Sequence, residues 1–151
     1  MNERIEYSYF KELKIVSEKL YYELMEVNEN DIIKKIIKTA VYIFNASFAC
    51  EIGLKTIIMA EDSINKVTGH KLNDLYIQLS LNSKQFIESK MSKLQLDNND
   101  IQHYLSIISD NFVDWRYFYE TEDKNGNAKS YETNCLFIYD FLNAIEEFIL
   151  K

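Results

Sequence analysis

The chain has 151 residues, a formal net charge of −7 and 47% hydrophobic residues. This length fits a single domain spanning residues 1–151, and the apolar content is high enough for a core that needs no metal or disulfide. The acidic charge argues against bulk electrostatic attraction to nucleic acid. Proline is absent and glycine occurs three times, so the composition favours long helices.

The first half of the chain predicts two long helices. Apolar residues at steps of three and four predict an amphipathic helix over residues 5–27. Asn30 is the expected cap of the second helix, and Asp31 suits the positive end of its dipole. If unbroken to Asp62, this helix would be about 48 Å long. Apolar residues lie on more than one of its sides, which is typical of a central helix or a subunit contact.

Shorter elements follow. Gly69 and His70 mark a break, and the pattern after it predicts a short helix over residues 72–79. Asn82 and Asn99 each stand three residues before a glutamine, the spacing of a capping box, so we expect a further helix to begin at each.

The chain ends with one loop and one helix. Residues 121–130 are the expected loop, with a turn at Asn125-Gly126. The last helix carries apolar residues at helical spacing from Tyr131 to Ile149. No strand pattern or internal repeat is present. The expected fold is therefore an all-α antiparallel bundle of four to five main helices plus a short connecting helix.

Several kinds of site are excluded. Cys50 and Cys135 fall in apolar helical patterns, so we expect reduced core cysteines. The two histidines, His70 and His103, lack metal-ligand neighbours at the required spacing, and no phosphate-cradling glycine loop is present, so no metal and no cofactor is expected. Without an uninterrupted apolar run of membrane length or a signal-peptide core, we expect a cytoplasmic protein that does not contact a membrane.

Glu51 is the first candidate for a ligand-binding residue. It stands on the apolar stripe of the second helix, where burying a lone carboxylate would be costly. Lys55 follows one helical turn later and can pair with it, and Arg116 could reach it from a facing helix. Glu51 is either a structural partner, a residue at a partly exposed end of the bundle, or a functional carboxylate.

Arg116 is the second candidate, because it lies among aromatic residues that include Trp115, Tyr117 and Tyr119. It can pair with Glu120 on its own helix, stack on an aromatic ring, or bind a phosphate through its bidentate guanidinium. We take Arg116 and Tyr117 as ligand-binding candidates, and Arg116, Glu120 and His70 as the candidates for any catalytic role.

The remaining polar residues are interpreted more simply. His70 is expected to be a cap or a packed turn residue, and His103 to be exposed. The lysines at positions 34, 35 and 38 form a small basic face, which is either solvated or an RNA contact.

Three segments together resemble one known family. They are NASFACEIGLKTIIM (residues 45–59), GHKLNDLY (residues 69–76) and NFVDWRYFYE (residues 111–120). Their order and spacing are similar to those of the HEPN superfamily of prokaryotic helical domains. That resemblance implies a helical bundle that commonly dimerises, in a toxin–antitoxin, phage-defence or RNA-processing system. It also implies a metal-independent ribonuclease in many members, with an Arg followed after four to six residues by a His.

This chain departs from the ribonuclease pattern after Arg116. Thr121, Glu122 and Asp123 stand where the family's His is expected, and carboxylates there would repel RNA phosphate. In the first segment, Ile52 and Gly53 stand where members have a leucine-containing stretch.

Three interpretations therefore remain open. The first is a non-catalytic HEPN-like module, a homodimer that binds a protein from the same operon, a nucleotide or RNA. The second is a divergent ribonuclease toxin that uses Arg116 with Glu120 or His70 as a substitute acid or base. The third is a structural helical inhibitor or adaptor protein.

Overall fold

A computed structural model describes the backbone of residues 4–64, 66–91, 94–116 and 128–151, and their side chains outside 110–116 and 128–134. These residues contain six helices and no strand, which confirms the all-helical prediction. The helices are α1 (Ile5–Met25), α2 (Ile32–Asp62), α3 (Leu72–Gln78), α4 (Leu81–Lys90), α5 (Asn98–Arg116) and α6 (Ala128–Leu150). Five of them are main helices, and α3 is the short connecting one.

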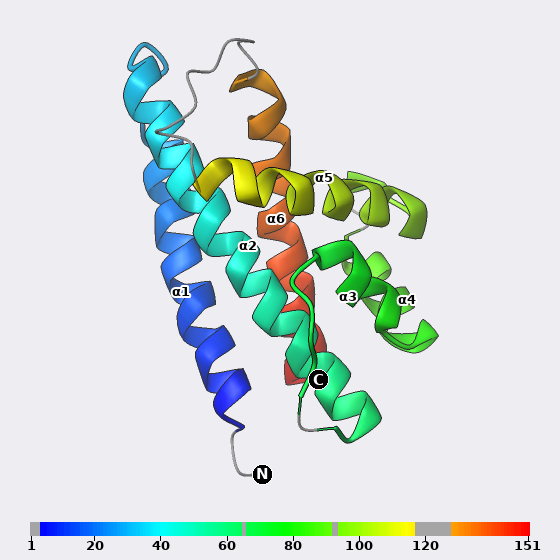
Figure 1. The fold of residues 1–151 in the computed structure, drawn as a ribbon. Helices are drawn as coiled ribbons and strands as arrows, with labels where there is room; N and C mark the ends of the chain where they lie inside the picture. The colour runs from blue at the N-terminus through cyan, green and yellow to red at the C-terminus, as the bar shows by residue number, and fades with distance from the viewer. Residues whose placement is uncertain (1–3, 65, 92–93, 117–127) are drawn as a thin grey trace.

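The long helices α1, α2 and α6 lie alongside one another, while α5 crosses α2 and the short helices α3 and α4 lie to one side (Figure 1). The pairs Tyr9–Phe48 and Glu23–Lys38 show that α1 and α2 are antiparallel. In contrast, α6 runs in the same direction as α2, because three helices intervene between them.

Close packing of the three long helices centres on Gly53 in α2. A Cβ atom at this position would lie 2.7 Å from Ile145 Cγ2 on α6 and 2.8 Å from Phe10 Cε2 on α1. Both of those side chains are fully buried. Contacts this short leave no room for a side chain, so the glycine lets the three helices approach one another.

The helix lengths match the sequence pattern, whereas the predicted caps are wrong by one or two residues. Asp31, not Asn30, caps α2, since its side chain accepts a hydrogen bond from the Lys34 backbone N–H at 3.1 Å. Ser80 caps α4 in place of Asn82. Asp97 and Asp100 exchange hydrogen bonds at the start of α5, in place of a box at Asn99.

The last three residues of the expected loop at 121–130 belong to α6 instead, because this helix begins at Ala128. The turn predicted at Asn125-Gly126 lies outside the described residues. Both cysteines are buried and neither forms a disulfide, as expected from their positions in apolar stripes.

One of the described helices, α2, is long and apolar enough to pass a length-and-hydropathy test for a membrane span, with a window of mean hydropathy 1.4. The sequence pattern predicts no uninterrupted apolar run of membrane length. However, 67% of that window is buried inside the bundle, which matches the expectation of a central helix. The hydropathy of α2 is therefore accounted for by its contacts with α1, α3, α5 and α6.

Candidate functional site

Glu51 lies in the middle of α2 and is 6% exposed. Its Oε1 atom accepts hydrogen bonds from two side chains: Lys55 Nζ lies 2.8 Å away and His70 Nδ1 lies 2.9 Å away. The Lys55 contact follows from helix geometry, since residues four apart share a face. The pairing of Glu51 with Lys55 was expected, but the contact with His70 was not.

His70 reaches Glu51 from the extended segment between α2 and α3. Ser63 ends α2 in the left-handed region with φ of 53°, and Gly69 has φ of +100°. The space around Gly69 is open, so glycine is required there by the backbone and not by crowding. These two residues set the path that brings residue 70 beside α2.

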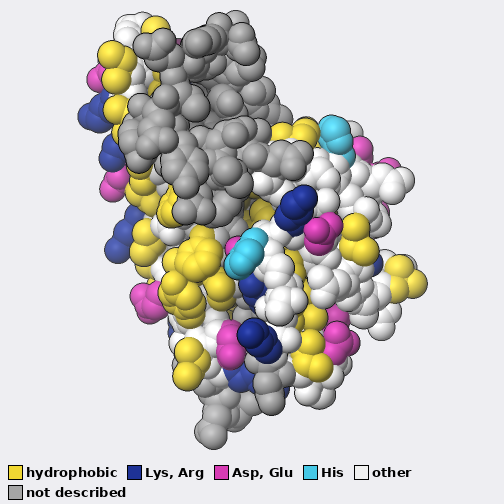
Figure 2. Space-filling model, in the orientation of Figure 1, with side chains coloured by type: hydrophobic (Ala, Val, Ile, Leu, Met, Phe, Trp, Pro, Cys, Tyr) yellow, Lys and Arg dark blue, Asp and Glu magenta, His cyan; other side chains and the backbone are white. Residues whose placement is uncertain are grey.

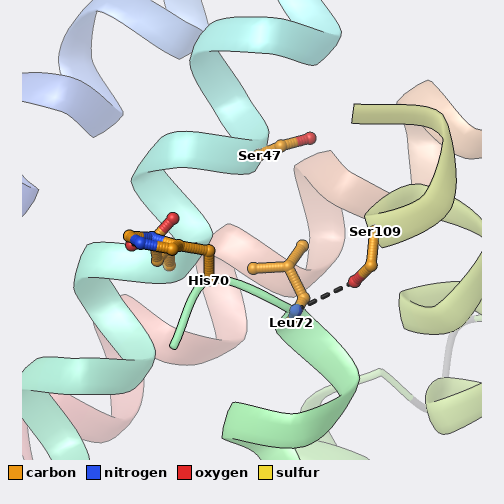
Figure 3. Close-up of a pocket in the computed structure, with 5 residues that line it drawn as sticks. Ser47, His70, Leu72 and Ser109 are labelled. Carbon is orange, nitrogen blue, oxygen red and sulfur yellow. Dashed lines mark hydrogen bonds and ion pairs between the residues drawn. The ribbon is translucent and has the colours of Figure 1, made fainter. Parts of the chain in front are cut away.

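The structure corrects the interpretation of His70 as a cap or a packed turn residue. Lys71, not His70, is the residue at the start of α3. The His70 side chain is 82% exposed, and only its Nδ1 edge is held. Its ring is turned toward α2 and away from Ser109 (Figure 3). His103 is exposed, as predicted.

The start of α3 is tied to α5 by Ser109. The Leu72 backbone N–H donates to Ser109 Oγ at 2.9 Å, and the same hydroxyl donates to the Leu105 carbonyl at 2.7 Å. The Lys71 side chain makes no capping hydrogen bond, so Ser109 satisfies an N–H that the first turn of α3 would leave unpaired. This contact fixes α5 against the segment that carries His70.

A cavity of about 10 Å³ lies between these elements, lined by Ser47, Glu51, His70, Leu72 and Ser109 (Figure 3). Sites for drug-sized ligands are usually at least about 300 Å³. A nucleotide therefore does not fit in this cavity as the side chains stand. The arrangement is a buried carboxylate next to two serine hydroxyls, with a lysine and an exposed histidine on the carboxylate.

Most of the third sequence motif cannot be placed against this cavity. Arg116 is the last residue of α5, and its side chain and that of Trp115 lie outside the described residues, as do Tyr117, Tyr119 and Glu120 entirely. The expected contact between Arg116 and Glu51 therefore remains a prediction. Sequence reasoning missed Ser47 and Ser109, because a serine inside an amphipathic helix carries no distinctive signal.

The basic face at the start of α2 is partly neutralised by α1. Lys38 Nζ lies 2.8 Å from Glu23 Oε2, and the hydrogen bond and charge of Lys38 lower the pKa of this carboxyl. Lys34 is exposed and Lys35 is half-buried. The chain thus adds an acidic partner to a face that could otherwise attract RNA phosphate.

Two other polar clusters hold helices together. Lys14 on α1 contacts Glu18 at 2.6 Å and Glu146 of α6 at 2.7 Å. Glu61 at the end of α2 accepts hydrogen bonds from the Ser80 N–H and from the hydroxyls of Ser80 and Ser83 at the start of α4. Within the residues that the structure describes, no group of three His, Cys, Asp or Glu side chains is placed to hold a metal ion.

An exposed apolar surface runs along α1 and α2. Tyr9 on α1 packs edge-on against Phe48 on α2, with ring centroids 5.9 Å apart. On α2 the surface continues at steps of three and four residues, so its members share one side of the helix. Hydrophobic side chains gather over these two helices in Figure 2, beside the atoms drawn in grey. The α1/α2 face comprises Tyr9, Val16, Ile37, Val41 and Phe44, each between 44% and 51% exposed.

No protein-family model matches the chain, and no curated protein and no solved structure is significantly similar to it.

Proposed function

We propose that the chain is a non-catalytic HEPN-like domain that acts as a binding module and pairs with a second copy through the α1/α2 face. The HEPN likeness rests on the three sequence segments, and the binding role on two features of the fold. One feature is the contact between the segments around Glu51. The other is the exposed apolar face.

The observation that carries the proposal is the meeting of the sequence segments. Glu51 belongs to the first segment and His70 to the second, and their side chains are 2.9 Å apart. Leu72, also in the second segment, is hydrogen-bonded to Ser109 on α5, the helix that continues into the third. This contact between the first and second segments supports their belonging to one functional unit.

A binding role is favoured over catalysis because the centre of this unit is closed. The cavity beside Glu51 is about 10 Å³, and the carboxylate already engages Lys55 and His70. A carboxylate is also the wrong charge to stabilise the pentavalent phosphate of RNA cleavage. We therefore place the contact surface outside the cavity.

The α1/α2 face suits a second copy of the chain. Ile37 and Phe44 are seven residues apart on α2, as are Tyr9 and Val16 on α1, which is the repeat that lets two helices pack along their length. Exposed apolar patches of this kind mark interaction sites more often than isolated apolar residues do. The family resemblance adds a cytoplasmic prokaryotic defence, toxin–antitoxin or RNA-related setting. A further partner would then be a protein from the same operon, a nucleotide or RNA.

Self-association is tested with a matched pair of variants. Ile37 on the α1/α2 face is 51% exposed, and Ile77 on α3 is 52% exposed. We expect Ile37→Glu to convert a dimer into a monomer in light scattering coupled to gel filtration, and Ile77→Glu to leave the dimer intact. A wild-type monomer at all accessible concentrations, or equal effects of the two variants, contradicts the dimer proposal.

Absence of catalysis is tested with purified protein and structured and single-stranded RNA. We expect no cleavage above that of a mock preparation. Cleavage that disappears in Arg116→Ala would overturn the non-catalytic assignment while leaving the fold resemblance intact.

One observation favours the alternative, a divergent ribonuclease. The Glu51 carboxylate holds His70 through Nδ1 while the ring stays 82% exposed, and a carboxylate that orients an imidazole is a common arrangement in acid–base catalysis. On this alternative His70→Ala abolishes RNA cleavage and His103→Ala, which alters the other histidine, does not. Equal activity of the two variants removes the alternative.

A further inference from the structure

Among the described residues, Ser47 differs from the other buried serine and threonine side chains of the helices, whose hydroxyls are hydrogen-bonded. It is 3% exposed, and its Oγ atom has no hydrogen-bond partner in the part of the chain that the structure describes. Serine and threonine inside helices commonly donate to the carbonyl four residues earlier. Among the described residues, four side chains do so, at 2.7–2.8 Å: Ser17 to Leu13, Thr39 to Lys35, Thr56 to Ile52 and Ser109 to Leu105.

The Ser47 hydroxyl lies on the cavity instead. Its side chain points from α2 toward α5 in Figure 3, and Ser47 and Ser109 are both among the lining residues. A buried hydroxyl without a partner is unfavourable, because it has lost its hydrogen bonds to solvent. A group in the cavity that accepts a hydrogen bond would remove this cost.

The cavity has the size and the polar groups for a single water molecule. A space of about 10 Å³ is close to the minimum that holds one water, and buried waters usually make about three hydrogen bonds. Ser109 Oγ donates once and accepts once, which leaves one acceptor site on its oxygen. Glu51 accepts from Lys55 and His70, which leaves further acceptor sites on its carboxylate.

We propose that this cavity binds one ordered water, which receives a hydrogen bond from Ser47 Oγ and donates to the Ser109 hydroxyl and the Glu51 carboxylate. The water would join α2 to α5 next to the Leu72–Ser109 contact. It would thereby help to position the half of α5 that leads to Arg116. This site is independent of the proposed function, because it holds whether or not the chain dimerises or cleaves RNA.

The sign of a stability change tests the water site. If Ser47 were simply unpaired, Ser47→Ala would stabilise the fold, because it removes an unsatisfied hydroxyl and alanine is the better helix former. With a bridging water, we expect Ser47→Ala to lower the folding equilibrium constant about threefold to tenfold in urea denaturation. An increase overturns the proposal.

A double-mutant cycle adds a readout that a purely structural serine would not change. The hydroxyls of Ser47 and Ser109 are not hydrogen-bonded to each other in the structure, so coupling between Ser47→Ala and Ser109→Ala would not come from a direct hydrogen bond and is expected if both bind the same water. We expect a coupling of at least about threefold in the folding equilibrium constant. Thr56→Ala, which removes a back-bonded hydroxyl on the same helix, is the matched control and should show no coupling with Ser109→Ala.

The wild-type protein gives a test that no folding defect can obscure. A crystal structure at high resolution should show one water within hydrogen-bond distance of Ser47 Oγ, Ser109 Oγ and the Glu51 carboxylate. An empty cavity, or a Ser47 hydroxyl rotated onto the carbonyl four residues earlier, overturns the proposal.

Discussion

Two ion clusters in this molecule, each centred on one buried charged residue, have opposite charge arrangements. At the first, the cation Lys14 lies between two carboxylates, Glu18 on its own helix and Glu146 on α6. At the second, the anion Glu51 lies between Lys55 on its own helix and His70 on an extended segment. Both clusters thus combine a contact four residues away with a contact far along the chain.

The two clusters differ in the element that carries the residue contacted from far along the chain. Glu146 sits on a long helix packed against α1, so the first cluster is held rigidly from both sides. His70 sits on a segment outside any helix, is largely exposed and borders a cavity. The first cluster therefore fixes helices, whereas we expect the second to attach a segment that can be displaced without unfolding the core.

Lys14→Ala should have the largest effect, because it removes a 5%-exposed cation from between two carboxylates together with its packed aliphatic stem. We expect a loss of about 2–3 kcal/mol in the free energy of unfolding, measured by urea denaturation. Lys14→Met keeps the stem and should cost less, which separates packing from charge. A loss below about 0.5 kcal/mol for Lys14→Ala would show that the first cluster does not fix the helices.

Glu51→Gln should have a smaller effect, about 1–2 kcal/mol, because glutamine keeps an acceptor for Lys55 and His70 but removes the charge. Glu18→Gln is the matched control, since Lys14 still has Glu146 when Glu18 is neutral. Hydrogen exchange should rise at residues 66–72 in Glu51→Gln and stay unchanged there in Glu18→Gln. Identical exchange in the two variants would remove the distinction between the clusters.

In each cluster, the sequence predicts the contact between residues four apart on one helix, but it does not predict the contact with a residue far along the chain. The Glu51–Lys55 contact follows from four-residue spacing on a helix, and so it could be expected without coordinates. The His70 contact spans 19 residues and depends on left-handed backbone at Ser63 and Gly69. Ser63 gives no sign of that conformation, because a non-glycine residue adopts it only when its surroundings impose it.

The same difference between local and long-range contacts explains which parts of the fold could be predicted from the sequence. Long apolar stripes at helical spacing gave the number and lengths of the main helices, because burial of one face selects that period. The caps were displaced by one or two residues, because Asn30 and Asp31 are both good capping residues and tertiary contacts decide between them. At α4 the deciding contact is Glu61, which binds Ser80 and Ser83 from the preceding long helix.

Substitution of Glu61 should have the smallest effect on the free energy of unfolding, and this effect should depend on pH in the acid range. Burial raises the pKa of this carboxyl, but the hydrogen bonds from Ser80 and Ser83 lower it more, so the net pKa is below its ordinary value of 4.5. A carboxyl with a lowered folded-state pKa stabilises the fold above its unfolded pKa, and this stability is lost as the pH falls through the folded value.

Stability of the wild type should therefore decline as the pH drops below about 4.5, partly through Glu61. Glu61→Gln should weaken that dependence and be less stable than the wild type at pH 7, in denaturation curves recorded from pH 3 to pH 7. Lys14 has the opposite sign: burial lowers its pKa, but Glu146 and Glu18 raise it more, so its contribution is complete below its ordinary value of 10.5. A decline below about pH 4.5 that is as steep in Glu61→Gln as in the wild type would mean that acid sensitivity is not set at the α2–α4 junction.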